Sequence, residues 1–193
     1  MVFPAVLGIV WACLYGITMK IADLLDEHGL HWFKGDQILF GFLWGLFCSL
    51  AIITTPALGN AFLADVLAFL VRMRIDYRNH AIATAIVVLS FIMFSTFQPI
   101  LFFSFFGVFV ILGWIRDELD DTHKRTDWLQ KIFEFSWYYI AAPLVYALLT
   151  QDWLLFFAFI TYLVGYNVIK YCLEKSHHAP KNESANESKN IIA

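Results

Sequence analysis

Long apolar runs alternate with short polar segments along the whole chain. A helix needs about 20 apolar residues to cross the hydrocarbon layer of a membrane, with a range of about 17–25. Seven candidate runs follow this pattern: residues 2–22, 37–55, 57–73, 80–97, 99–115, 132–150 and 153–172. Because backbone polar groups in lipid must be satisfied internally, each run is expected to be a helix. The pattern predicts an all-α, polytopic transmembrane bundle of about seven spans in residues 1–173.

The composition supports a membrane protein. The chain is 60% hydrophobic and only 15% charged, whereas a soluble domain is about 45–50% apolar and about 25% charged. Its mean hydropathy is +0.67. The net charge of −3 offers no strongly basic surface for nucleic acid. Three cysteines, Cys13, Cys48 and Cys172, lie inside apolar runs, and we expect them to be small core residues, not a disulfide or metal framework.

The basic residues gather at one set of predicted helix ends. The thirteen are Lys20, Lys34, Arg72, Arg74, Arg78, Arg116, Lys124, Arg125, Lys131, Lys170, Lys175, Lys181 and Lys189. By the positive-inside rule this side is cytoplasmic, so the N-terminus is expected outside and the C-terminus inside. Residues 174–193 are polar and low in complexity, which predicts a disordered cytoplasmic tail. The one-sided charge and the absence of a signal-peptide pattern favour an integral protein of a prokaryotic cell membrane.

Acidic residues are concentrated at the same helix ends, in three groups that also carry a base and a histidine. The groups are "KIADLLDEHG" (20–29), "RMRIDYRNHA" (72–81) and "RDELDDTHKR" (116–125). Residues three or four apart share a helix face, so Asp23 pairs with Glu27 and Asp117 with Asp121. The two negative charges of such a pair repel each other, and a bound divalent cation removes this repulsion. Mg²⁺ in particular uses one or two carboxylates together with phosphate oxygens.

The acidic motifs resemble those of the UbiA-type intramembrane prenyltransferases. That family is all-helical and has two Asp-rich motifs, N-D-x-x-D-x-x-x-D and D-x-x-x-D, at cytoplasmic helix ends four helices apart. Here "DELDD" (117–121) is similar to the second motif and "DLLDE" (23–27) to a shortened first one, and they follow the first and fifth apolar runs. The chain departs from the family in having seven predicted spans instead of nine, and Met19 where the first motif has Asn.

The resemblance implies a Mg²⁺-dependent transferase acting on an isoprenoid diphosphate or another membrane lipid (di)phosphate. It implies that Asp23, Glu27, Asp117 and Asp121 are catalytic. The implied Mg²⁺ ligands are Asp23, Asp26, Glu27, Asp117, Asp120 and Asp121. The implied phosphate-binding residues are Lys20, Arg72, Arg74 and Arg78.

Other functions stay open. Asp65 lies in the middle of the third apolar run, where a carboxylate costs about 2.5–3.5 kcal/mol on insertion scales and often marks a transport path. A cation or proton transporter is therefore the alternative. A metal hydrolase built from His28, His80, His123, Asp76 and Asp120 is a further hypothesis, although no H-E-x-x-H spacing is present. A noncatalytic membrane scaffold also fits the composition.

Overall fold

The computed structural model describes residues 2–27, 30–73, 78–121, 133 and 136–177. Seven helices form within these ranges, one for each predicted apolar run, and none of the described residues forms a strand. They are α1 (Val2–Glu27), α2 (Asp36–Ile52), α3 (Pro56–Val71), α4 (Arg78–Phe94), α5 (Pro99–Asp121), α7 (Tyr138–Thr150) and α8 (Leu154–His177). The predicted all-α class is confirmed.

Three helices are long and apolar enough to cross a membrane. These segments are Ala5–Asp26 in α1, Pro99–Leu119 in α5 and Leu154–Leu173 in α8. The other four helices have 13–17 residues, so the structure supports three spans by length where the sequence predicted seven. The difference arises because apolar residues continue past the helix ends. Ile53, for example, lies in the turn between α2 and α3.

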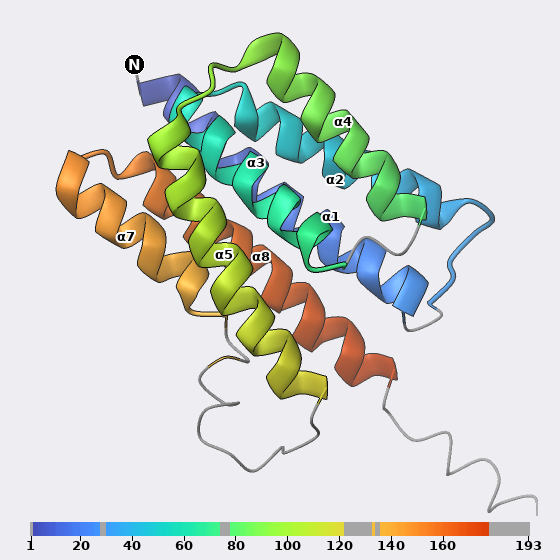
Figure 1. Cartoon of the computed structure of the whole chain (residues 1–193). Coiled ribbons are helices and arrows are strands. Elements are labelled where there is room, and N and C mark those ends of the chain that lie inside the picture. The colour runs from blue at the N-terminus through green and yellow to red at the C-terminus, as the bar shows by residue number, and fades with distance from the viewer. Residues whose placement is uncertain (1, 28–29, 74–77, 122–132, 134–135, 178–193) are drawn as a thin grey trace, which may run out of the picture.

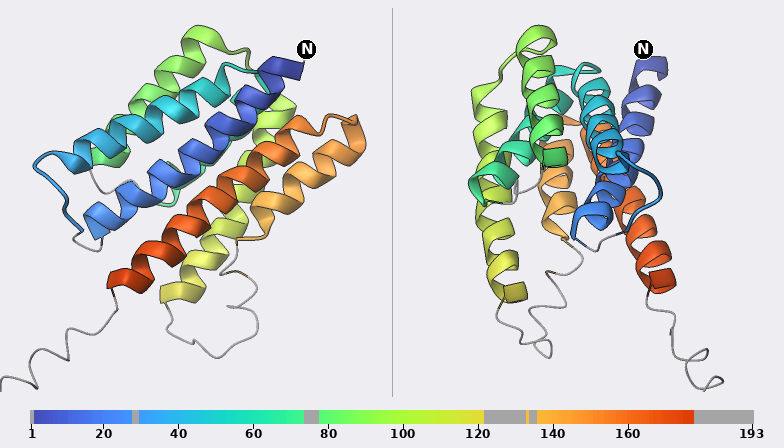
Figure 2. Two further views of the ribbon diagram at one scale, coloured as in Figure 1. Left: turned by 180° about the vertical axis from the view of Figure 1, so that it is seen from behind. Right: turned by 90° about the vertical axis from the view of Figure 1, so that its right-hand side faces the viewer.

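Successive helices run in opposite directions, and the bundle has two layers. Seen from behind, α4, α2, α1, α8 and α7 follow one another in a row that curves at α4 and α7 toward α3 and α5, which lie on its far side (Figures 1 and 2). The C-terminal ends of α1, α3, α5 and α8 lie at the same end of the bundle, opposite the N-terminus (Figure 1). This end carries the described basic residues and the acidic groups, because alternating helix directions return the chain there after every second helix.

Helix α3 is the most enclosed, and eleven of its residues are buried. Its start is fixed by Thr55, whose side-chain oxygen accepts a hydrogen bond from the Leu58 N–H, and by Pro56 in the first turn. Large apolar side chains elsewhere are open at the outer surface; Ile100 is 86% and Leu149 80% exposed. Such a surface is typical of a protein that contacts lipid.

Two details differ from the sequence expectations. Cys48 is buried as predicted and Cys13 is half-buried, but Cys172, in the last two turns of α8, is exposed. Helix α8 also continues to His177, four residues into the segment predicted as a tail. Residues 178–193 lie outside the described residues.

Candidate functional site

An ion pair joins the end of α3 to the last turns of α5. Arg72 Nε lies 2.9 Å from Asp117 Oδ2, and the two side chains are only 4% and 15% exposed. The Arg72 guanidinium also donates a hydrogen bond to the Phe109 carbonyl, at 3.3 Å. Gly113 makes this crossing possible, since a Cβ atom there would collide with the Arg72 guanidinium. Arg72 is therefore held against one face of α5, over about two turns.

A second cluster surrounds Asp23 at the end of α1. His80 Nε2 of α4 lies 3.0 Å from Asp23 Oδ1, and Tyr166 of α8 donates its hydroxyl to Asp23 Oδ2, also at 3.0 Å. Lys20 Nζ lies 5.3 Å from the centre of the Tyr166 ring, within the range of a cation–π contact. Asp26 is near enough for His80 and Asp23 to act on its charge. Asp23 thus links three helices through contacts that occupy both of its oxygens.

The structure divides the predicted site residues between these clusters. Among the described residues, no three His, Cys, Asp or Glu side chains gather as a metal-binding group. Asp23, Asp26 and Asp117 therefore do not form a shared three-ligand site. Arg78 is exposed at the start of α4. The side chains of Glu27, Arg74, Asp120 and Asp121 lie outside the described part of the chain, as do His28, Asp76 and His123 of the hydrolase hypothesis.

Asp65 lies at the centre of the bundle and is fully buried. The hydroxyl of Tyr15 in α1 donates a hydrogen bond to Asp65 Oδ2, at 3.1 Å. Tyr139 of α7 and Arg72, two turns along α3, are close enough to act on its carboxyl group. Around it, the Tyr15 and Tyr162 rings stack with centroids 4.7 Å apart. The predicted mid-helix acid is thus inside an aromatic cage and faces the protein, not lipid.

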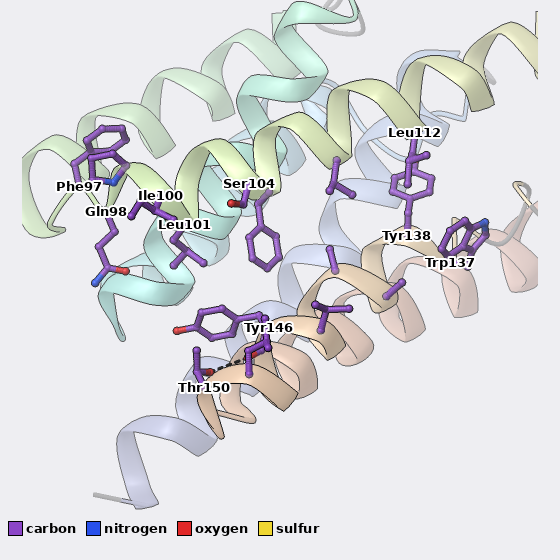
Figure 3. Close-up of a pocket in the computed structure, with 17 residues that line it drawn as sticks. Phe97, Gln98, Ile100, Leu101, Ser104, Leu112, Trp137, Tyr138, Tyr146 and Thr150 are labelled. Atoms are coloured by element: carbon purple, nitrogen blue, oxygen red, sulfur yellow. Dashed lines mark hydrogen bonds between the residues drawn. The ribbon is translucent and has the colours of Figure 1, made fainter.

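An apolar groove separates α5 from α7. It has a volume of about 900 Å³ and is lined by residues 97–101, 104, 105, 108 and 112 with 137, 138, 141, 142, 145, 146, 149 and 150. Figure 3 shows Gln98 and Thr150 toward one end and Leu112 with Tyr138 at the other. The second end adjoins the Arg72–Asp117 pair, because Leu112 precedes Gly113 and Tyr138 acts on the charge of Arg72. We call this lining the α5/α7 groove.

No family model matches this chain, and neither does any curated protein or solved structure that was compared with it. The site is therefore interpreted from its own residues.

Sequence reasoning missed the tyrosines. Tyr15, Tyr138, Tyr139 and Tyr166 were not among the predicted site residues, although each is part of the clusters above. The only sequence signal is the run "WYY" at 137–139. Aromatic residues at the ends of apolar runs are common at membrane interfaces, so this signal does not distinguish a site from a lipid anchor.

Proposed function

We propose that the protein is an integral membrane transferase that acts on a prenyl or other lipid (di)phosphate, in the manner of the UbiA-type enzymes it resembles. In this proposal all seven helices lie within the membrane and the Arg72–Asp117 end faces the cytoplasm of a prokaryotic cell. The supporting observation is the α5/α7 groove, which leads from the lipid-facing surface to a buried arginine. In this proposal the apolar chain of the substrate lies in the α5/α7 groove, and its phosphate lies next to the groove at Arg72.

Charge explains the role proposed for Arg72. In prenyl transfer the allylic carbon–oxygen bond breaks and its electron pair leaves with the diphosphate. An acceptor atom supplies the pair for the new bond and releases a proton. Arg72 is nearly excluded from water, and a guanidinium in such a place stabilises developing negative charge far better than one in water. Asp117 holds the guanidinium in a fixed orientation.

The described residues do not by themselves fit a resident Mg²⁺. Asp23 already accepts from His80 and Tyr166, and Asp117 is paired with Arg72. That the activity depends on Mg²⁺ stays a prediction. The ion would enter together with the diphosphate and would bind one or two carboxylates of the protein.

The test is diphosphate release from geranylgeranyl diphosphate by the purified protein in lipid, with Mg²⁺ or with EDTA and with a membrane lipid extract as the source of acceptor. Asp117→Asn removes the charge yet keeps an oxygen for Arg72. We expect it to abolish a Mg²⁺-dependent release. Asp152→Asn is the control, because Asp152 accepts from the Leu154 N–H at the other end of the bundle and Asn caps helices equally well. Release that Asp117→Asn leaves intact would contradict the proposal.

Transport is the second candidate, and one observation favours it. Asp65 is a fully buried carboxyl group in the middle of α3, and acids at such depth commonly carry protons or cations. The test is proton or cation flux into liposomes that contain the protein. A flux that is unchanged in Asp65→Asn would eliminate this candidate.

A further inference from the structure

The connection between α1 and α2 exposes two large aromatic side chains next to a base. Residues 30–35 are its described part, and within it Trp32 is 48% and Phe33 51% exposed. Lys34 follows them and is also exposed. Apolar side chains that are grouped at a surface, unlike single scattered ones, mark a place of contact with a protein or a membrane.

The main chain of this connection is held by Asp36, the first residue of α2. Its buried carboxylate accepts hydrogen bonds from the N–H groups of Trp32, at 2.7 Å, Phe33, at 3.3 Å, and Gln37, at 2.8 Å. Gly35 has a φ of +91°, a left-handed conformation that glycine adopts without strain. Because these hydrogen bonds use main-chain groups, the rings of Trp32 and Phe33 stay at the surface while the connection itself is fixed.

The two rings continue the outer apolar face of α2. Ile38 and Phe42 of that helix are exposed, and the Trp32 ring packs edge-on against Phe40 near the start of the helix, with centroids 5.5 Å apart. Helix α2 has 17 residues, which at about 1.5 Å per residue gives a length of about 25 Å. The hydrocarbon layer of a membrane is about 30 Å thick. Trp32 and Phe33 therefore extend the apolar surface past the start of a helix that is too short for this layer.

We propose that the connection between α1 and α2 is an interfacial anchor, which binds the phospholipid headgroup layer at the end of the bundle where charged residues gather (Figure 1). Trp32 and Phe33 lie at the boundary between headgroups and acyl chains, and the Lys34 ammonium lies among the lipid phosphates. The inference rests on the membrane location in the proposed function, and it does not depend on the transferase activity.

The chemistry of the three side chains fits a phospholipid surface. Tryptophan combines an apolar ring with an N–H donor, and it is enriched where the hydrocarbon layer meets the headgroups. Phe33 adds apolar area beside it. A lysine can lay its apolar stem along such a surface while its ammonium remains among charged headgroups. Lipid is favoured over a protein partner because the two rings are continuous with an exposed helix face of the same apolar character.

The experiment measures membrane depth by electron paramagnetic resonance on the full-length protein in phospholipid vesicles. A nitroxide is attached to one cysteine, Phe33→Cys, Lys34→Cys or Leu89→Cys, in a background without the three native cysteines. The measured quantity is the ratio of nitroxide collisions with oxygen, which concentrates in lipid, to collisions with a water-soluble nickel chelate. Leu89, exposed in the middle part of α4, is the reference for the hydrocarbon layer. We expect the ratio at position 33 to be below that at position 89 and several-fold above that at position 34.

A second comparison tests the role of Asp36. In Asp36→Ala the main chain of residues 32 and 33 loses its acceptor, so the ratio at position 33 should fall toward the ratio at position 34. Asp152→Ala is the matched control, because Asp152 accepts from the Leu154 N–H at the start of another helix, α8. A ratio that Asp36→Ala leaves unchanged would show that Asp36 does not hold the anchor.

The outcomes separate this inference from the proposed function. A lipid-like ratio at position 89 together with equal ratios at positions 33 and 34 would overturn the anchor and leave the membrane location in place. A water-like ratio at position 33 would also overturn it and would favour a protein partner, since the vesicles contain no other protein. A water-like ratio at position 89 would overturn the membrane location itself. Diphosphate release is not measured here, so the transferase proposal is decided by its own test.

Discussion

At the scale of single residues, three buried charged side chains link different helices. Asp65, Asp23 and Arg72 each bind a group from another helix. A polar group buried in a bundle of this kind is stabilised only where such a partner exists. The residues of the candidate site are therefore also residues that fix how the helices are rotated against one another.

Tyr15→Phe should destabilise the protein because it removes the hydroxyl that donates to Asp65. Measured hydrogen bonds inside membrane proteins average about 0.6 kcal/mol, with a maximum near about 1.7 kcal/mol. We expect a loss within that range, measured by denaturant unfolding in detergent micelles. Tyr171→Phe, at an exposed position, should change the unfolding free energy by less than about 0.5 kcal/mol. Equal effects of the two substitutions would show that the Tyr15–Asp65 contact contributes no stability.

Asp36, which precedes the apolar run of α2, should show a pH-dependent contact. The Trp32 N–H, followed by those of Phe33 and Gln37, donates to its carboxylate and lowers the pKa of Asp36, and His31 at 3.7 Å acts in the same direction. A lowered folded-state pKa gives a contribution to stability that is present above the unfolded value of about 3.9. This contribution is lost as pH falls through the folded pKa.

The measurement is the amide proton chemical shift of Trp32 during an NMR titration from about pH 6 to about pH 2. The chemical shift of the Trp32 amide proton should stay constant near the start of the titration and change only below about pH 4. Asp36→Asn should abolish the movement. A transition well above the ordinary aspartate pKa would contradict the assigned hydrogen bonds.

At the scale of elements, small residues decide which helices touch. Gly41 and Gly45, four residues apart on α2, face the backbone of Asn79 and Ala83 on α4. Small residues at this spacing let helix backbones approach closely in membranes, where apolar side chains gain nothing by leaving lipid. The charged cluster of Asp23 depends on this contact, because His80 follows Asn79 on α4.

Gly45→Ala should separate α2 from α4. A Cβ atom at Gly45 would lie 2.8 Å from Ala83 Cα, and backbone atoms cannot move aside cheaply. We expect a loss of about 1–3 kcal/mol in unfolding free energy, as in other overpacked cores. Gly107→Ala on α5 is the matched control, since nothing lies within 4 Å of its Cβ position. That change should be neutral or stabilise the helix by up to about 1 kcal/mol. A larger loss at Gly107 than at Gly45 would contradict the assigned packing.

At the scale of the whole molecule, the bundle is polar at one end and apolar along its sides. Alternating helix directions bring the C-terminal ends of α1, α3, α5 and α8 together (Figure 1). The Arg72–Asp117 and Asp23–His80 pairs lie on these helices and at the start of α4. The α5/α7 groove runs from near this end to the apolar outer surface at Ile100 and Leu149. This arrangement is the reason for proposing a substrate with an apolar chain and a charged head.

The predicted orientation can be tested by labelling from outside intact cells. The connection between α1 and α2 lies at the polar end and that between α7 and α8 at the opposite end (Figure 1), and they contain Lys34 and Asp152. The variants Lys34→Cys and Asp152→Cys are made in a background without the three native cysteines. The positive-inside rule predicts that a membrane-impermeant maleimide labels position 152 and not position 34. Permeabilised cells should show both labelled. Labelling of position 34 alone in intact cells would show that the orientation is the reverse of the predicted one.

The sequence by itself determined the helices and the end of the bundle at which charge gathers. Apolar length and the position of charged residues between apolar runs are local properties, and they predicted all seven helices even though four proved shorter than expected. Asp65 was recognised as an unusual acid for the same reason, since it lies inside an apolar run.

Only the tertiary structure decided which groups meet. Arg72 pairs with an acid 45 residues away and Asp23 with a histidine 57 residues away, and helical spacing alone predicts neither. It also gave Asp23 and Asp117 different partners, His80 with Tyr166 for the first and Arg72 for the second, and it opened a groove between α5 and α7. These features depend on helix rotation and on which helices are neighbours. Both are set by side-chain packing between distant segments, which no local pattern in the sequence records.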